Sequence, residues 1–106
     1  MKYNDIGQSE IKVSELCLGT MTWGSQNSQS DANRQIEIAM DYGINFLDTA
    51  EMYPTTPISS KTQGDTERII GQWLQATKKR TEIVLATKIT GKGFKSIRTV
   101  SYTHLR

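Results

Sequence analysis

Apolar residues follow two different spacings along the chain. Short, nearly continuous apolar runs occur at residues 15–19, 44–47 and 82–87, which is typical of strands covered on both faces. Between these runs, apolar residues recur at helical spacing over residues 32–42 and 65–77. The order strand, helix, strand, helix, strand predicts two parallel crossover units and an α/β fold.

The first predicted helix has signals at both of its ends. Ser30 or Asp31 is a suitable N-cap, and Gly43 is suited to a left-handed cap after the last turn. The residues expected to face the core are Ala32, Ile36, Ala39 and Met40. These signals predict a helix that packs on the sheet along one face.

The second predicted helix begins at Asp65 or Thr66 and ends at Thr77. Its expected core face consists of Ile69, Ile70, Trp73 and Leu74. The basic triplet at residues 78–80 complements the negative end of a helix, so we interpret it as a dipole cap or solvated surface.

The remaining segments predict turns and loops. Residues 2–13 favour a hairpin with Gly7 in its turn. Residues 55–63 are too rich in polar residues and proline for regular structure. The glycines at 91 and 93 lack the full spacing of a phosphate-binding loop, so this segment is predicted to be an ordinary loop.

Composition limits the class of protein. The chain has 106 residues, whereas a complete barrel of alternating strands and helices needs roughly 250, so we expect a piece of a single domain. A net charge of +2 with 23% charged residues does not indicate a nucleic-acid partner. No apolar run approaches the length that spans a bilayer, so we expect no membrane association and a cytoplasmic location.

The single cysteine, Cys17, lies in an apolar run and is predicted to belong to the core.

Three polar side chains follow the ends of the second and third predicted strands. Asp48 ends the run at 44–47, Tyr53 lies in the loop beyond it, and Lys88 ends the run at 82–87. If these strands are parallel neighbours, an acid, a phenol and an amine meet at one sheet edge. A free tyrosine has a pKa of about 10 and is a poor proton donor near neutrality, but an adjacent ammonium stabilises the phenolate. Each residue alone favours a structural reading, as a cap, a loop aromatic or a solvated strand end; the three together favour carbonyl reduction.

Three ordered motifs resemble the aldo-keto reductases. They are Leu-Gly-Thr-Met-Thr-Trp-Gly at 18–24, Gly-Ile-Asn-Phe-Leu-Asp-Thr-Ala-Glu-Met-Tyr at 43–53, and Ala-Thr-Lys-Ile at 86–89. The resemblance runs from about residue 2 to about residue 98. The long loop at 54–66 is similar to that of the bacterial Tas-like branch.

The resemblance implies the N-terminal part of a (β/α)8 TIM barrel, with an N-terminal β-hairpin that caps the barrel bottom and about three βα units. By resemblance, Tyr53 is the proton donor, Lys88 tunes it, and Asp48 pairs with the lysine. The implied binding residues for NADP are Gly19, Thr20, Met21 and Asp48, and Trp23 is implied to line the substrate pocket. No metal is expected. The family's fourth catalytic residue, a histidine, and its adenosine-phosphate clamp belong to later segments, and His104 is assigned no role.

The function implied by the resemblance is NADP-dependent reduction of a small aldehyde or ketone to an alcohol. Potassium-channel β-subunits share the motifs around residues 48–51 and 87–89, so a nicotinamide-binding regulatory or redox-sensing module is an alternative. A non-functional fragment is a third reading. Residues 1–99 are expected to form the barrel portion. Residues 100–106 resemble a transposase adaptor translated as coding sequence, and they are excluded from these arguments.

Overall fold

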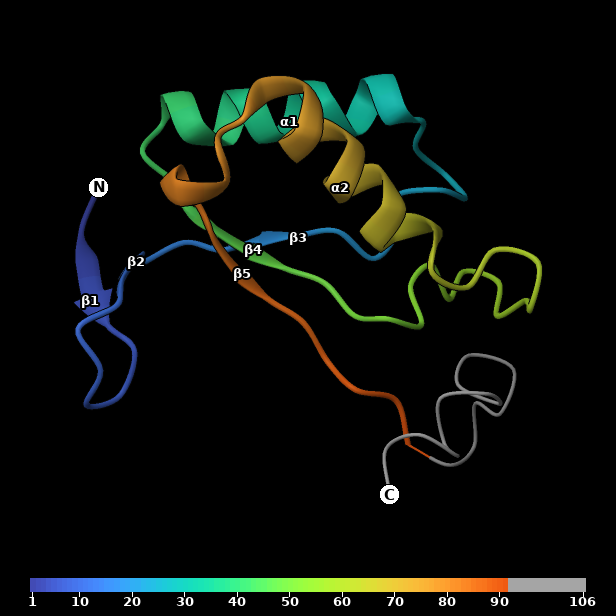
Figure 1. Cartoon of the computed structure of the whole chain (residues 1–106), viewed down its shortest axis with the longest axis horizontal. Helices are drawn as coiled ribbons and strands as arrows, with labels where there is room; N and C mark the ends of the chain where they lie inside the picture. The colour runs from blue at the N-terminus through green and yellow to red at the C-terminus, as the bar shows by residue number, and fades with distance from the viewer. Residues whose placement is uncertain (92–106) are drawn as a thin grey trace.

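The computed structural model describes residues 1–91, which form a hairpin and a small parallel sheet covered by two helices (Figure 1). The strands are β1 (Tyr3–Asp5), β2 (Lys12–Ser14), β3 (Leu18–Gly19), β4 (Phe46–Asp48) and β5 (Val84–Ala86). The helices are α1 (Gln29–Asp41), α2 (Asp65–Thr77) and a short 3-10 turn, η1 (Arg80–Glu82). The predicted order of elements is therefore confirmed.

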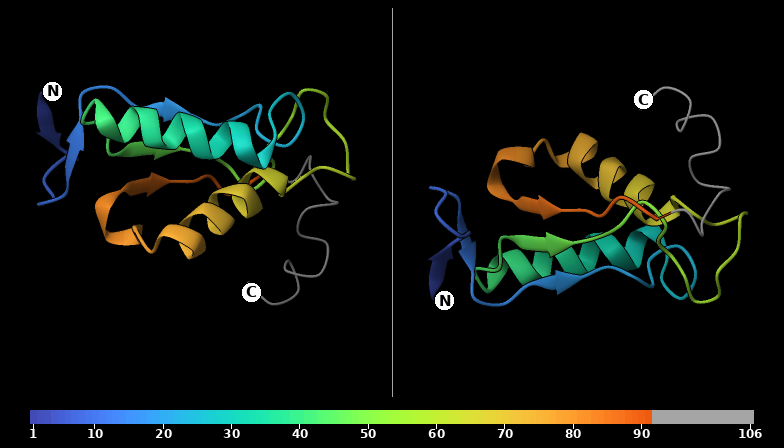
Figure 2. Two further views of the ribbon diagram at one scale, coloured as in Figure 1. Left: turned by 90° about the horizontal axis from the view of Figure 1, so that it is seen from above. Right: turned by 90° about the horizontal axis from the view of Figure 1, so that it is seen from below.

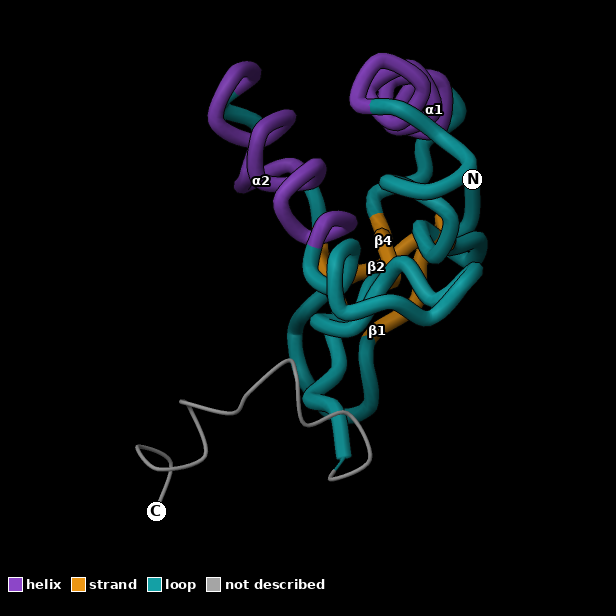
Figure 3. Tube along the Cα trace, turned by 90° about the vertical axis from the view of Figure 1, so that its right-hand side faces the viewer, coloured by secondary structure: helices purple, strands orange, loops and turns teal. Residues whose placement is uncertain are grey.

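The parallel sheet has the strand order β3-β4-β5, so α1 and α2 are the crossover helices between neighbouring strands. Both helices cover the same face of this sheet (Figures 2 and 3). Leu47 pairs with Leu18 on one side and Leu85 on the other. Because side chains alternate along a strand, this row packs on the helices while Asp48 points to the opposite face.

The core lies between the sheet and the two helices. Its buried members are Trp23, Ala32, Ile36, Leu47, Ile70, Trp73 and Ile83. The predicted core faces of both helices are thus confirmed, with Met40, Ile69 and Leu74 partly buried against the same cluster. Leu47 is fully buried. Replacing such a leucine with alanine typically lowers the free energy of unfolding by about 2–5 kcal/mol.

The start of α1 differs from the prediction. The N-cap is Ser28, whose hydroxyl accepts a hydrogen bond from the amide of Asp31, while the Asp31 carboxylate accepts one from the Ser28 amide. This reciprocal capping box places Asp31 inside the first turn, so Ser30 and Asp31 were wrong as caps. The end is as predicted, because Gly43 follows the helix with φ of +85°.

Helix α2 begins at Asp65 and ends at Thr77, as predicted. The first residue of the basic triplet, Lys78, is its C-cap, with φ of 58° and its amide bonded to the carbonyl of Leu74. Neither helix in residues 1–91 has the length and apolar character that crossing a membrane requires.

The prediction that Cys17 belongs to the core is wrong, because its side chain is exposed. The strand predicted over residues 15–19 is only Leu18–Gly19, and it pairs with a neighbour on one side alone in the described part of the chain. Leu18 packs against the core, so the residue before it faces the side of the sheet without helices. Desolvation and the nearby charge of Asp48 raise the pKa of the Cys17 thiol, which therefore stays protonated near neutral pH.

The predicted hairpin is confirmed, with antiparallel pairing of β1 and β2 and Gly7 in the turn at φ of +54°. Asn45 ties it to the start of β4. The Asn45 side chain accepts from the Ser14 amide at 2.7 Å and donates to the Lys12 carbonyl at 3.0 Å. The hairpin therefore lies at the amino ends of the parallel strands, away from the edge that carries the polar trio.

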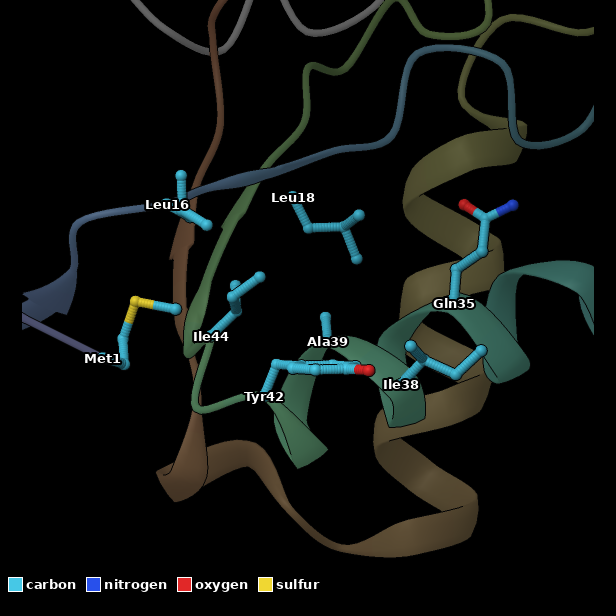
Figure 4. A pocket seen from close by; sticks show the side chains of 8 residues that line it. All are labelled: Met1, Leu16, Leu18, Gln35, Ile38, Ala39, Tyr42 and Ile44. Carbon is cyan, nitrogen blue, oxygen red and sulfur yellow. The ribbon is translucent and has the colours of Figure 1, made fainter.

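An apolar groove of about 420 Å³ lies between α1 and β3 (Figure 4). It is lined by Met1, Leu16, Leu18, Gln35, Ile38, Ala39, Tyr42 and Ile44. Its only polar side chains are those of Gln35 and Tyr42, so it lacks the charged groups of the trio. In a closed barrel, this flank of α1, on the side away from α2, faces another helix of the outer ring.

Candidate active site

The carboxyl ends of β4 and β5 bring the trio together. Asp48 is the last residue of β4 and pairs with Ala86, the last residue of β5. Tyr53 lies in the loop after β4, and Lys88 lies two residues beyond β5. Parallel pairing places both loops at one sheet edge (Figure 1), where loops carry chemistry on a rigid scaffold.

Lys88 is the centre of this cluster. Its Nζ donates to both carboxylate oxygens of Asp48, at 2.8 and 2.9 Å, and to the carbonyl of Thr49 at 2.9 Å. The same Nζ lies 3.4 Å from the hydroxyl of Tyr53 and 5.1 Å from the centroid of its ring. The structure thus brings together all three residues that the sequence singled out.

The hydrogen bond to Asp48 raises the pKa of Lys88 above its ordinary value of 10.5, and the contact with Tyr53 acts in the same direction. Lys88 is therefore an ammonium at neutral pH, with a positive charge beside the Tyr53 hydroxyl. The ion pair remains open to solvent, since the side chains of Lys88 and Asp48 are 45% and 40% exposed.

Backbone hydrogen bonds hold the tyrosine in the loop. The Tyr53 carbonyl accepts from the amides of Gly64 and Thr66, at 3.0 and 3.3 Å, so it is fixed to the start of α2. Its amide donates to the carbonyl of Ala50 at 3.1 Å. Both ends of the long loop therefore converge on the residue whose hydroxyl meets Lys88.

The predicted cofactor residues lie at the same edge. Gly19 pairs with Asp48 across β3 and β4, and the buried Thr20 hydroxyl donates to the Asp48 carbonyl at 2.8 Å. Met21 is 44% exposed. A Cβ on Gly19 would meet nothing within 4 Å, so the described residues leave open space directly over this backbone.

Trp23 lies in the core rather than on an open surface. Its side chain is 1% exposed, its indole nitrogen donates to Gln35 at 2.9 Å, and its carbonyl accepts from the Thr66 hydroxyl at 2.5 Å. These contacts join the β3 loop to both helices. The substrate-pocket role of Trp23 stays a prediction, and its burial in residues 1–91 gives that role no support.

Sequence reasoning missed three contacts that support the site, although Thr20 itself is a predicted cofactor residue. The Thr49 carbonyl binds Lys88, the Thr20 hydroxyl fixes the backbone of Asp48, and the Glu51 carboxylate accepts from the amide of Thr90. The first is a main-chain atom and the others join residues distant in sequence, so no local pattern signals them. Within residues 1–91, no group of three or more His, Cys, Asp or Glu side chains is arranged to hold a metal. Residues 100–106, including His104, lie outside the described part of the chain.

Comparison with known proteins connects this site to a family. Residues 15–104 match the model of the Aldo/keto reductase family. Protein tas of Escherichia coli strain K12 is 46% identical over 91 residues, which are 86% of this chain and 26% of protein tas. An Arabidopsis thaliana protein named "Probable voltage-gated potassium channel subunit beta" is 35% identical over 91 residues, 84% of this chain and 25% of that protein.

A solved structure shows the same architecture. The aldo-keto reductase AKR11C1 from Bacillus halodurans, in its holo form, matches with a TM-score of 0.67 and 36% identity over 84% of this chain and 26% of that chain. The predicted fold, the N-terminal part of a (β/α)8 barrel, is thereby confirmed. The chain spans about a quarter of the length of the curated relatives it matches.

Proposed function

The chain belongs to the aldo/keto reductase family, and on this premise we propose that it supplies the proton-transfer residues of an NADP-dependent reductase. The proposed reaction converts a small aldehyde or ketone to an alcohol. The observation that carries the proposal is the contact of Lys88 with both Asp48 and Tyr53 at one sheet edge. A cytoplasmic location is part of the same proposal.

The three side chains have complementary roles in proton transfer. The Tyr53 hydroxyl gives its proton to the carbonyl oxygen while hydride reaches the carbonyl carbon, and the remaining phenolate is stabilised by the Lys88 ammonium beside it. Asp48 accepts two hydrogen bonds from that ammonium and so holds it in place. Tyr53 is half-buried, so a solvent proton can restore the hydroxyl after each turnover.

The cofactor would rest on the ends of β3 and β4. Gly19, Thr20, Met21 and Asp48 are the residues proposed to hold it, since Gly19 leaves open space above its backbone and Thr20 fixes Asp48. When bound, NADPH supplies the hydride, which becomes the new C–H bond of the alcohol. The proton of the O–H bond comes from Tyr53, and the balance is one hydride and one proton for each carbonyl reduced.

The experiment uses a barrel chimera, in which residues 1–91 of this chain replace the matching segment of the Bacillus halodurans reductase. We expect the chimera to oxidise NADPH when a reactive aldehyde is added and to release the corresponding alcohol. The same host reductase without substitution checks the assay. A folded chimera that binds NADPH but forms no alcohol would contradict the proposed function.

A second candidate is a nicotinamide-binding regulatory module. It is favoured by the 35% identity to the protein named as a potassium channel subunit beta. A regulatory module should bind NADPH without appreciable turnover, so binding and alcohol formation, measured on the same chimera, separate the two candidates.

A further inference from the structure

The segment that carries Lys88 lies beyond the end of its strand. Strand β5 ends at Ala86, and the ladder continues with the Thr49 amide donating to the Ala86 carbonyl at 2.8 Å. The next ladder bond, from the Glu51 amide to the Lys88 carbonyl, is longer, at 3.3 Å. The regular sheet therefore weakens at the residue whose side chain must be held most accurately.

The side chain of Glu51 makes a second bond to the same segment. Its carboxylate accepts from the amide of Thr90 at 2.6 Å, a short hydrogen bond to an ionised acceptor. Thr90 is buried, with 5% of its surface exposed. An amide in such a position needs a partner within the protein, because water has little access to it.

Glu51 thus binds the chain at two points just after the Cα atom that carries the Lys88 side chain. Its amide contacts the carbonyl of Lys88, and its carboxylate contacts the amide two residues later. Glu51 itself follows Thr49 by two residues, and the Thr49 carbonyl accepts from Lys88 Nζ. The loop after β4 therefore holds Lys88 by its ammonium, and through Glu51 it also holds the backbone that follows the Lys88 side chain.

We propose that Glu51 is a positioning residue, which fixes the Lys88 segment through the Thr90 amide and thereby sets the distance between the ammonium and the Tyr53 hydroxyl. The inference rests on the proposed reductase function. Glu51 does not donate the proton. A small displacement of a catalytic group lowers the rate strongly, since a misplacement of about 1 Å can cost about 10²-fold.

The experiment compares Glu51→Ala with Glu51→Gln in the barrel chimera. The alanine variant loses the acceptor, so kcat should fall by about 10- to 10²-fold, with KM for the aldehyde changing by less than about threefold. Glutamine keeps a carbonyl acceptor for the Thr90 amide and should restore kcat to within about fivefold of the parent. Glu37→Ala, on the exposed face of α1, controls for the loss of a carboxylate and should leave kcat unchanged.

A second readout does not depend on turnover. Hydrogen exchange in the peptide that covers residues 86–91 should be faster in Glu51→Ala than in the parent or in Glu37→Ala. If the parent chimera exchanges as expected but forms no alcohol, the reductase proposal fails while the exchange result still tests the contact. Parent-like kcat and exchange in Glu51→Ala would overturn the positioning role, as would a glutamine variant no better than alanine.

Discussion

Replacing Lys88 with methionine removes the ammonium while keeping a side chain of similar length. The ion pair with Asp48 is 45% and 40% exposed, and exposed pairs contribute about 0.2–1 kcal/mol. The Asp48 carboxylate stays accessible to water, so it remains solvated when the lysine is removed and the loss of its partner costs little stability. Lys88→Met should therefore lower the free energy of unfolding by no more than about 1 kcal/mol.

The effect on proton transfer should be larger. Opposite unit charges about 4 Å apart near a protein surface interact by about 4 kcal/mol, and the Lys88 ammonium lies 3.4 Å from the Tyr53 hydroxyl. Asp48 offsets part of this attraction, which leaves about 1–3 kcal/mol, or roughly 10- to 10²-fold in kcat. The fall in kcat has a direct cause, because the phenolate that forms as the proton leaves loses its neighbouring positive charge.

The assay measures kcat for aldehyde reduction by the barrel chimera at neutral pH, together with thermal unfolding. The pKa of Lys88 is raised in the folded state, so its contribution to stability is complete below 10.5 and is lost only as the pH rises beyond that value. The pair is therefore intact in the parent throughout the neutral range. Lys12→Met is the matched control, because Lys12 forms an exposed ion pair with Asp5 in the hairpin. A kcat in Lys88→Met equal to that of the parent would refute the reasoning.

Three other outcomes are expected. The full-length barrel that contains this chain should use NADPH with higher catalytic efficiency than NADH, and equal efficiencies would contradict the proposed cofactor. Ser28→Ala removes the N-cap of α1 and should lower the free energy of unfolding of the chimera by about 1 kcal/mol in denaturant titrations, whereas exposed Ser60→Ala should change it little. The 106-residue chain alone should aggregate and form no alcohol, since β3 and β5 have unpaired edges within residues 1–91; a monomer with a cooperative melt and turnover would contradict this.

The elements were predictable because the local signals agree with the packing. Gly43 ends α1 in a left-handed conformation, and Ile70 and Trp73 are buried at the spacing that predicted α2. Ser28 and Asp31 have the three-residue spacing of a reciprocal capping pair. The apolar spacing begins only at Ala32, however, so it does not indicate how many polar residues of the first turn precede it. Local periodicity gives helix faces more reliably than helix starts.

The burial of single residues was less predictable. An apolar run suggests that Cys17 is buried, but burial depends on which side of the sheet the helices cover. For Trp23 the difference has the opposite sign. The resemblance implies a position lining a pocket, but contacts with Gln35 and Thr66 hold the residue in the core. The exposure of Cys17 and the burial of Trp23 both depend on contacts between distant segments, and the spacing of residues along the chain does not encode these contacts.

The residues of the site were predictable, but their supports were not. Asp48, Tyr53 and Lys88 follow strand ends in motifs that the sequence shows directly, and their contacts are present in the structure. Thr20 and Glu51 act through the backbone atoms of residues 28 and 39 positions away. Such bonds follow from strand pairing, and they become visible only when the register is known.

The central claim, that Tyr53 donates the proton, is tested most directly by Tyr53→Phe in the barrel chimera. Phenylalanine keeps the ring and removes only the hydroxyl, so NADPH affinity should stay within about twofold of the parent. The kcat for reduction of a reactive aldehyde should fall by about 10²- to 10⁴-fold, the usual contribution of a general acid. The exposed residue Tyr42 provides the matched control, and Tyr42→Phe should reduce aldehyde at the parent rate. Near-parent kcat in Tyr53→Phe, with NADPH binding preserved, would contradict the account.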